Sequence, residues 1–383
     1  MKVCYCNDSF PPLFDGVATT VVNYARIFSE KYGDAAVLTP YYRDADDSRF
    51  PFPVIRCPSF RSAVFREYRV GNPLSRRAVK AVERFQPDII HCHTPAATLA
   101  LGMRLKRRTG VPLILTYHTK YDMEVGRIVS VPFLRRPLMR AMLWGINDCD
   151  EVWCVCRGAE ENLREMGYRG KTVLMTNGVD FPKGPAEESA VAALRAELRL
   201  PENVPVFLFV GRMIRFKGLD IILSALAGLK ERGRDFRMIF VGDGADLDSV
   251  RAQAESLGIG GECVFAGYVP ERERLRAFYS AADLFLLPSS YDNCPLTVRE
   301  AFSCGCPSVL LRNSSSAEGF TDGETAFLID DSAESLLSKL LEIGWDKALV
   351  QRVGHTAMET LWYPWDEAVK AAYERYQHLL DRR

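Results

Sequence analysis

The sequence predicts an α/β protein made of two doubly wound domains, each with parallel strands covered by helices. The chain has 383 residues, which exceeds the roughly 100 to 200 residues of one ordinary domain. Short apolar runs alternate with amphipathic stretches in both halves, as is typical of parallel sheets. This alternation pauses at residues 176–185, TNGVDFPKGP, and then starts again. We therefore expect one domain over residues 1–180 and a second over residues 181–360.

In the first half, strands are predicted at residues 2–6, 35–39, 88–91, 112–117, 151–156 and 171–175, and helices at 17–31, 76–85, 98–108, 134–146 and 157–166. Gly16 stands where the loop after the first strand meets a helix, so either a ligand approaches the backbone there or it is a plain turn glycine. His118 follows a strand and could hydrogen-bond a polar ligand, although a structural role fits equally well. His91 and His93 share a strand face without a suitably spaced third metal ligand, which favours packing or hydrogen bonding.

In the second half, strands are predicted at 206–210, 238–241, 263–266, 284–287 and 308–311, with helices that begin at 190, 219 and 297. Arg212 and Lys217 flank the turn between the strand at 206–210 and the next helix. Two cations beside a helix N-terminus suit a diphosphate, whereas an unrelated pair of loop cations is usually solvated. The GDG sequence at 242–244 lacks the third glycine of a dinucleotide-binding fingerprint, which disfavours an oxidoreductase.

Two acids, Asp292 and Glu300, flank a loop that joins a predicted strand to a helix. In an open α/β sheet this is the edge where ligands bind, and the helix N-terminus favours phosphate. Asp292 precedes the helix and can reach a polar ligand, while Glu300 can accept two hydrogen bonds from a vicinal diol. Their spacing alone favours a capping aspartate and a solvated glutamate.

The formal net charge is zero, but the two halves differ in sign. Residues 1–180 hold 26 Lys and Arg against 19 Asp and Glu, a net charge of +7, and residues 181–383 carry −7. Basic residues lie among apolar ones at 54–84 and 101–140, which predicts either contact with an anionic membrane surface or a solvated basic face. Because no recognised nucleic-acid-binding module accompanies them, we expect no nucleic acid partner.

The eleven cysteines do not suggest a disulfide framework, since their number is odd and several fall in apolar runs. This usage favours the reducing cytoplasm. The first strand begins at Lys2 without a signal peptide, and no apolar run approaches about 18 residues. We therefore expect a cytoplasmic protein that does not cross a membrane.

Residues 281–330 resemble the signature of retaining glycosyltransferases with two Rossmann domains, the GT-B fold, of the bacterial family-4 type. That signature has two Glu residues separated by seven residues, and EAFSCGCPSV matches its second part. Asp292 stands in place of the first Glu, and residues 293–295, Asn-Cys-Pro, replace Pro-Phe-Gly. GRMIRFKG matches the G-R-x-x-x-x-K-G of the family. HCHTP and TYHTKYD resemble the diacylglycerol glucosyltransferases within it.

The resemblance implies a hexosyltransferase whose two domains face a central cleft, with residues 361–383 forming a helix that crosses back onto the first domain. It implies catalytic roles for His118, Asp292, Arg212 and Lys217, with the two cations on the donor diphosphate and Asp292 at the transferred sugar. Glu300 is implied to bind the ribose diol. The other implied donor contacts are Gly16 near the sugar and phosphates, Gly267, Tyr268 and Val269 near the base, and Leu296 and Thr297 at the distal phosphate.

The resemblance also implies transfer with retention, without a covalent enzyme intermediate, a cofactor or a required metal. The favoured donor is UDP-glucose, and the favoured acceptor is a lipid such as diacylglycerol at the inner face of the plasma membrane. Two alternatives stay open: the same fold acting on a soluble or polysaccharide-precursor acceptor, and a non-catalytic sugar-nucleotide binder. The sequence does not indicate the oligomeric state.

Overall fold

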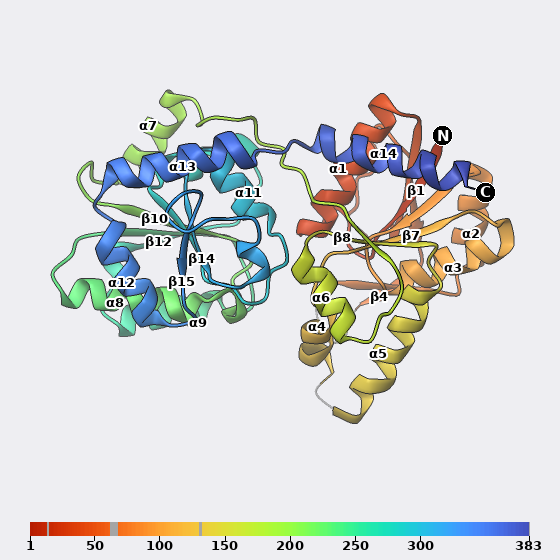
Figure 1. The fold of residues 1–383 in the computed structure, drawn as a ribbon, viewed down its shortest axis with the longest axis horizontal. Coiled ribbons are helices and arrows are strands. Elements are labelled where there is room, and N and C mark those ends of the chain that lie inside the picture. The colour runs from red at the N-terminus through yellow and green to blue at the C-terminus, as the bar shows by residue number, and fades with distance from the viewer. Residues whose placement is uncertain (14, 62–67, 130–131, 383) are drawn as a thin grey trace. The chain divides into compact units, whose positions relative to one another are not determined.

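The computed structural model describes residues 1–383 except 14, 62–67, 130–131 and 383. It divides into two compact units (Figure 1). Unit 1 comprises Met1–Gly178 and Trp365–Arg383, and unit 2 comprises Val179–Pro364. The domains predicted at 1–180 and 181–360 have their boundaries a few residues away from these, and the predicted C-terminal segment at 361–383 corresponds to a helix that begins at Trp365.

Unit 1 is built on a seven-stranded parallel sheet in the order β3-β2-β1-β6-β7-β8-β9. The strands are β1 (Lys2–Cys6), β2 (Asp34–Pro40), β3 (Val54–Cys57), β6 (Ile89–Cys92), β7 (Leu113–Tyr117), β8 (Glu151–Cys154) and β9 (Thr172–Leu174). The helices are α1 (Gly16–Lys31), α2 (Arg76–Phe85), α3 (Ala97–Thr109), α4 (Tyr121–Ile128), α5 (Pro132–Asn147), α6 (Arg157–Glu165) and α14 (Trp365–Asp381). A small antiparallel hairpin, β4 (Ser59–Arg61) with β5 (Arg69–Gly71), stands apart from the sheet.

Unit 2 is built on a six-stranded parallel sheet in the order β12-β11-β10-β13-β14-β15. Its strands are β10 (Val206–Val210), β11 (Arg237–Val241), β12 (Cys263–Gly267), β13 (Leu284–Leu287), β14 (Ser308–Leu311) and β15 (Phe327–Ile329). Its helices are α7 (Glu188–Glu197), α8 (Leu219–Glu231), α9 (Leu247–Ser256), α10 (Arg272–Ala281), α11 (Leu296–Ser303), α12 (Ala333–Ile343) and α13 (Lys347–Leu361). Strands β10, β13 and β14 are buried along their whole length, which explains why they read as unbroken apolar runs.

The strand order identifies one topological switch point in each sheet, where the chain changes its direction of winding. In unit 2 it lies between β10 and β13, which pair through Phe207 and Leu284. In unit 1 it lies between β1 and β6, which pair through Val3 and Ile89. The loops at the carboxyl ends of such neighbouring strands diverge and leave room for a ligand. Both sheets therefore confirm the predicted doubly wound α/β class.

The C-terminal helix α14 belongs to unit 1, where it packs beside α1. Arg375 donates to both carboxylate oxygens of Glu151, at 2.5 and 2.9 Å. The Tyr376 hydroxyl lies 2.6 Å from Nδ1 of His91, and Tyr373 stacks on Tyr32. These contacts give the aromatic C-terminal segment a packing role in unit 1.

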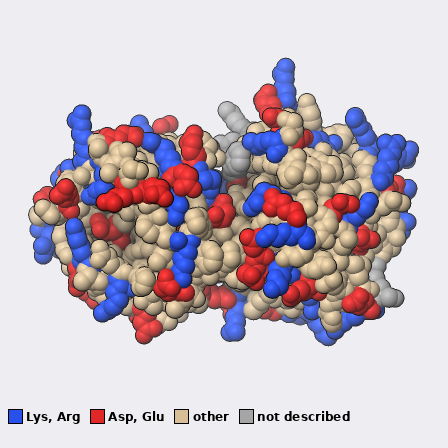
Figure 2. Space-filling model, turned by 90° about the horizontal axis from the view of Figure 1, so that it is seen from above, with Lys and Arg blue, Asp and Glu red and all other residues tan. Residues whose placement is uncertain are grey.

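Charged side chains of both signs are interspersed on the face drawn in Figure 2. The +7 and −7 of the two halves therefore do not form single-sign surfaces on that face. Among the residues that the structure describes, no helix is both long and apolar enough to span a bilayer. All eleven cysteines are free thiols, and most of them are buried.

Candidate functional site

The loop between β10 and α8 carries the two predicted phosphate-binding cations. It runs from Gly211 through a short 3₁₀ turn at Arg215–Lys217 to Gly218, and the Lys217 side chain is mostly buried. Gly218 has a φ of +78°, and a Cβ atom there would lie 2.0 Å from the carbonyl oxygen of Pro288, just after β13. Only glycine fits this conformation and this contact. The loop after β10 is thus pressed against the loop after β13, at the switch point.

Lys217 and Asp292, which are distant in sequence, are paired at this switch point. The Lys217 Nζ atom donates to Oδ1 of Asp292 at 2.6 Å, and the two side chains are 10% and 13% exposed. The other carboxylate oxygen of Asp292 accepts a hydrogen bond from the Ser289 hydroxyl at 2.7 Å. Arg212 is half-buried at the beginning of the same loop. The structure therefore brings the predicted cations and the first acid into one region of unit 2.

The GDG turn at 242–244 has a packing function in this edge of the sheet. A Cβ atom on Gly242 would lie 1.9 Å from the carbonyl oxygen of Gly211, and one on Gly244 would lie 2.5 Å from that of Met213. Both glycines have positive φ, at +134° and +159°. Their small size lets the loop after β11 lie directly against the loop that carries Arg212.

The start of helix α11 presents polar groups that the described protein does not satisfy. Pro295 is the N-cap residue, and no described side chain caps the helix. The first N–H groups of a helix have no intrahelical acceptor. The Asn293 amide and the Thr297 hydroxyl are buried there without a hydrogen-bond partner among the described residues. This arrangement offers donors to a ligand oxygen beside the predicted amides of Leu296 and Thr297.

Cys294, inside the same loop, adopts a left-handed backbone conformation with φ at +46°. The Arg299 guanidinium, one turn into α11, donates to its sulfur at 3.2 and 3.4 Å. Cys294 belongs to the segment 293–295 that departs from the resembled signature, and its contact with Arg299 fixes the conformation of the loop.

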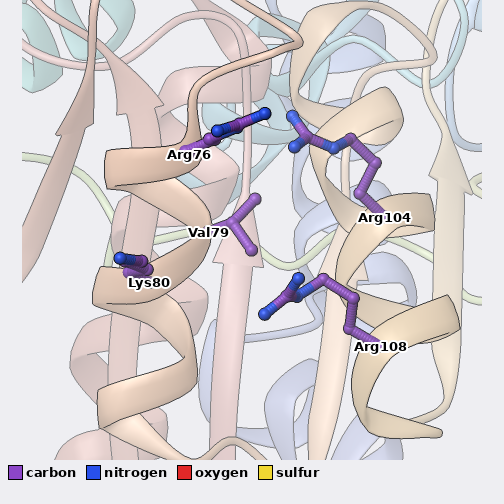
Figure 3. Close-up of a pocket in the computed structure, with 5 residues that line it drawn as sticks. All are labelled: Arg76, Val79, Lys80, Arg104 and Arg108. Atoms are coloured by element: carbon purple, nitrogen blue, oxygen red, sulfur yellow. The ribbon is translucent and has the colours of Figure 1, made fainter.

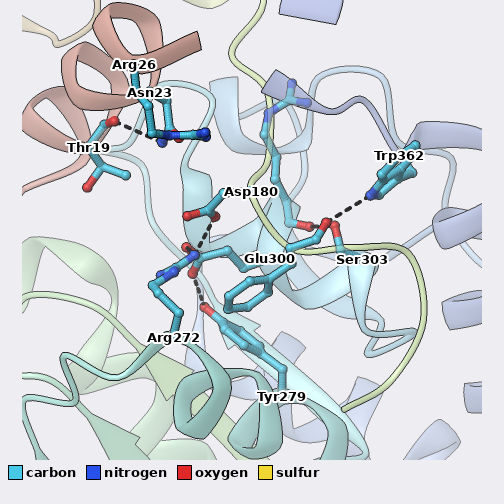
Figure 4. Close-up of polar contacts among 11 residues, drawn as sticks. Thr19, Asn23, Arg26, Asp180, Arg272, Tyr279, Glu300, Ser303 and Trp362 are labelled. Carbon is cyan, nitrogen blue, oxygen red and sulfur yellow. Dashed lines mark hydrogen bonds and ion pairs between the residues drawn. The ribbon is translucent and has the colours of Figure 1, made fainter. Parts of the chain in front are cut away.

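Glu300 is almost fully buried, and each of its carboxylate oxygens accepts a hydrogen bond within unit 2 (Figure 4). Its Oε1 accepts from Arg272 Nη2 at 2.8 Å, and its Oε2 accepts from the Tyr279 hydroxyl at 2.9 Å. The same Arg272 nitrogen donates to Asp180 at 2.5 Å. Burial raises the pKa of the Glu300 carboxyl, and the nearby Arg272 partly opposes that rise. Since a carboxylate oxygen accepts more than one hydrogen bond, each retains capacity for a further donor.

The segment predicted to meet the base follows β12. Gly267 has a φ of +71°, and its carbonyl oxygen accepts from the N–H of Gly242 at 2.8 Å. Tyr268 is 54% exposed, and Val269 is partly buried against the core of unit 2. The segment therefore presents one large exposed ring from a backbone that is fixed to the GDG turn.

In unit 1, aspartates organise the loops at the switch point. Asp8 follows β1 and accepts hydrogen bonds from Thr94 and Thr98, which fixes the start of α3. Asp15 caps α1 by accepting from the Ala18 N–H at 2.7 Å. The helix begins at Gly16, one residue earlier than predicted, and that glycine is exposed in its first turn.

His118 follows β7 and is held in a chain of buried histidines. Its Nε2 lies 2.9 Å from Nδ1 of His93, and the two rings stack. His91 is hydrogen-bonded to the hydroxyls of Tyr376 and Thr116, as predicted. Burial lowers the pKa of His118 to about 3, so its ring is neutral at neutral pH. Its Nδ1 is then the nitrogen left for a ligand.

Several residues of these sites were not predicted from the sequence. Arg272, Tyr279 and Asp180 surround Glu300, and Asn293 and Asp15 flank the two helix starts. Asp15 could have been found as an acid immediately before a helix. The partners of Glu300 are far from it in sequence and carried no local signal.

Two protein-family models match the chain, one in each half. The Glycosyltransferase Family 4 model matches residues 14–182. The model described as Glycosyl transferases group 1 matches residues 191–359, which contain Lys217, Asp292 and Glu300.

Curated relatives cover much or all of the chain at modest identity. The alpha-monoglucosyldiacylglycerol synthase of Streptococcus pneumoniae is 25% identical over 312 residues, covering 80% of this chain and 70% of that protein. The enzyme of the same name from Acholeplasma laidlawii is 22% identical over 395 residues, with 100% and 98% covered. The 2-deoxystreptamine glucosyltransferase of Streptomyces kanamyceticus is 29% identical over 235 residues, with 60% of each covered.

Solved structures share the whole fold. The crystal structure of Anabaena HepE in complex with UDP-glucose superposes with a TM-score of 0.78 at 19% identity, covering 100% of both chains. Sucrose-phosphate synthase from Thermosynechococcus elongatus gives a TM-score of 0.81 at 19% identity, also with 100% of both covered. At such identities the likeness concerns the fold.

Proposed function

Because the chain belongs to the GT-B glycosyltransferases, with a family 4 domain followed by a group 1 domain, we propose that it transfers glucose from UDP-glucose to a lipid acceptor such as diacylglycerol. The observation that carries the proposal is the switch point of unit 2. There a mostly buried Lys217 held by Asp292 lies in the loop next to the uncapped start of α11. A cation and free helix N–H groups together suit the diphosphate of a nucleotide-sugar.

Each predicted residue has a role in this reaction. Arg212 and Lys217 bind the diphosphate and stabilise the charge that develops on it as it leaves. Asp292 orients Lys217 toward the diphosphate and contacts the transferred sugar, and the amides of Leu296 and Thr297 bind the distal phosphate. Glu300 accepts from the ribose diol. The segment Gly267–Val269 contacts the base, with Tyr268 supplying the exposed ring.

From unit 1, His118 hydrogen-bonds a sugar hydroxyl through its neutral ring. The backbone at Gly16 lies close to the sugar and the donor phosphates. The acceptor hydroxyl forms the new bond to the anomeric carbon on the face from which the diphosphate departs. The carbon–oxygen bond to the diphosphate breaks, and the hydroxyl proton ends on the nucleoside diphosphate. This course retains the anomeric configuration and requires neither an enzyme nucleophile nor a metal.

Support for the donor and the acceptor comes from the names of similar proteins. HepE was crystallised with UDP-glucose, and two relatives are named monoglucosyldiacylglycerol synthases. We propose that the enzyme is cytoplasmic and works at the inner face of the plasma membrane, where the basic stretches of unit 1 meet anionic lipid. A relative named for 2-deoxystreptamine favours a soluble acceptor as the second candidate.

A binding screen followed by a transfer assay tests the proposal. Thermal unfolding is measured with UDP, GDP, ADP and their sugars, with and without EDTA. A stabilisation by UDP and UDP-glucose that survives EDTA is expected. Transfer is then measured to diacylglycerol in vesicles and to soluble acceptors, and the anomeric configuration of the product is read by NMR. Stabilisation without transfer to any acceptor would support a sugar-nucleotide binder instead, and no stabilisation would refute the proposed phosphate site.

A further inference from the structure

A pocket between helices α2 and α3 of unit 1 is lined mainly by cations. Its lining residues are Arg76, Val79, Lys80, Arg104 and Arg108, and its volume is about 100 Å³. Figure 3 shows Arg76 and Arg104 extending toward one another from the facing helices, while Arg108 points into the same gap. Val79 is buried and supplies the apolar wall. We propose that this pocket binds a phosphate group.

The sequence explains how the cations converge. Arg76 and Lys80 are four residues apart on α2, and Arg104 and Arg108 are four residues apart on α3, so each pair shares one helix face. Like charges at this spacing repel each other, and Figure 3 shows Arg76 facing Arg104 and Arg108 across the gap. Such an arrangement gains stability from an anion between the helices.

The protein supplies little negative charge of its own at this pocket. Glu83 pairs with Arg108 at 2.5 Å, and among the described residues no carboxylate lies within 4.0 Å of Arg76, Lys80 or Arg104. Arg104 is half-buried and is held by donation to the Pro73 carbonyl oxygen at 3.0 Å. A guanidinium fixed in this way retains N–H donors in the planar fork that matches phosphate oxygens.

The pocket is separate from the ligand-binding edge of the sheet. Both α2 and α3 run from the carboxyl edge of the sheet toward its amino edge. Helix α2 ends where β6 begins, and α3 starts after the end of β6 and leads to the beginning of β7. Arg76 begins α2, but Lys80 lies one turn further along it and Arg104 and Arg108 lie in the second half of α3. Asp8 and His118, in contrast, follow the carboxyl ends of their strands directly. The phosphate site therefore does not depend on the proposed sugar transfer, and its test needs neither donor nor acceptor.

The phosphate group could belong to a lipid headgroup or to a free anion, and two measurements distinguish these sources. Binding of inorganic phosphate is measured by calorimetry. Cosedimentation is measured with phosphatidylcholine vesicles that contain or lack phosphatidic acid. The pocket variant is Arg76→Gln with Arg104→Gln. The matched control is Arg77→Gln with Arg84→Gln, which removes the same charge from exposed positions of α2 outside the pocket.

We expect the pocket variant to lose about tenfold or more in phosphate-dependent binding, while the control keeps most of it. If the pocket variant loses binding of inorganic phosphate in calorimetry, the ligand is a free anion. If it loses only cosedimentation with the vesicles that contain phosphatidic acid, the ligand is a lipid headgroup. An equal effect of the two variants would show that only net charge matters and would overturn the proposal, as would a wild-type protein that responds to neither probe. Should the pocket variant unfold, Arg76→Lys with Arg104→Lys keeps the charge but loses the planar fork, and it should still weaken binding.

Discussion

Asp292 holds Lys217 by a 2.6 Å hydrogen bond between the loops that follow β10 and β13. The two loops meet because Gly218 lies against the carbonyl oxygen of Pro288. The other oxygen of Asp292 is fixed by Ser289. The aspartate that replaces the first glutamate of the resembled signature is thus placed to orient the lysine. We infer that its shorter side chain suits this pairing.

Replacing Asp292 by Asn should affect both stability and turnover. Lys217 would keep its mostly buried position without a carboxylate, which costs about 1–3 kcal/mol of unfolding free energy. We also expect turnover to fall about tenfold or more, because the lysine loses its orientation toward the diphosphate. Urea unfolding and steady-state kinetics measure the two effects. Asp330→Asn, at an exposed ion pair in the same unit, is the control, and an equal loss in both variants would contradict the assigned pairing.

Arg212→Ala should remove most of the turnover. A cation that stabilises a leaving diphosphate contributes about 10²–10³-fold to the rate. Initial rates with UDP-glucose give the change in kcat. Arg232→Ala, at the far end of α8, should leave kcat near the wild-type value. Turnover retained by Arg212→Ala would remove that residue from the proposed mechanism.

Gly218→Ala should destabilise unit 2 more than Gly267→Ala does. Both residues have φ near +75°, so each substitution carries the strain of a left-handed alanine, about 1 kcal/mol. Only at Gly218 would the new Cβ also meet a backbone oxygen, because none of the described residues has an atom within 4 Å of a Cβ at Gly267. Differential urea unfolding of the two variants isolates the contact with Pro288. Equal destabilisation would mean that the two loops are not closely packed in solution.

The doubly wound fold could be predicted because buried parallel strands such as Leu284–Leu287 form unbroken apolar runs between amphipathic helices. The glycines and cations of GRMIRFKG could be recognised because they are adjacent in sequence. Strands β3 and β15, the hairpin β4–β5 and helices α4, α9, α10, α12 and α13 were not predicted. Strands of three residues such as β4 and β5 are too short to show a hydrophobic period.

The environment of Glu300 illustrates what sequence cannot supply. The spacing from Asp292 suggested an accessible helix residue, but the carboxylate is almost fully buried. Its partners Arg272 and Tyr279 come from α10, which only the tertiary packing brings to α11. The pairing of Lys217 with Asp292 is of the same kind, since the strand order had to be known before the two loops could be placed together.

Glu300→Gln should impair recognition of the ribose. A carboxylate bond to a ribose hydroxyl contributes about 1.5–3 kcal/mol, so KM for UDP-glucose should rise roughly tenfold or more. The wild-type enzyme should prefer UDP-glucose over its 2′-deoxyribose analogue, and the variant should lose that preference. Tyr279→Phe removes one donor to the same carboxylate without removing the carboxylate, so it should retain the preference. Preference retained by Glu300→Gln would place the ribose elsewhere.

His118 should make the stability of unit 1 depend on pH in a defined direction. Burial lowers its pKa to about 3 in the folded state, below the value of about 6.5 in the unfolded chain. Between these values the unfolded state binds the proton, so stability is complete above pH 6.5 and falls as the pH decreases toward 3. His91 and His93 are shifted downward by the same burial and act in the same sense. His118→Gln should therefore show a shallower loss of unfolding free energy between pH 7 and pH 5 than the wild type, as measured by urea unfolding at each pH. The exposed His355→Gln serves as control, and a wild-type slope in His118→Gln would show that this imidazole does not remain neutral in the fold.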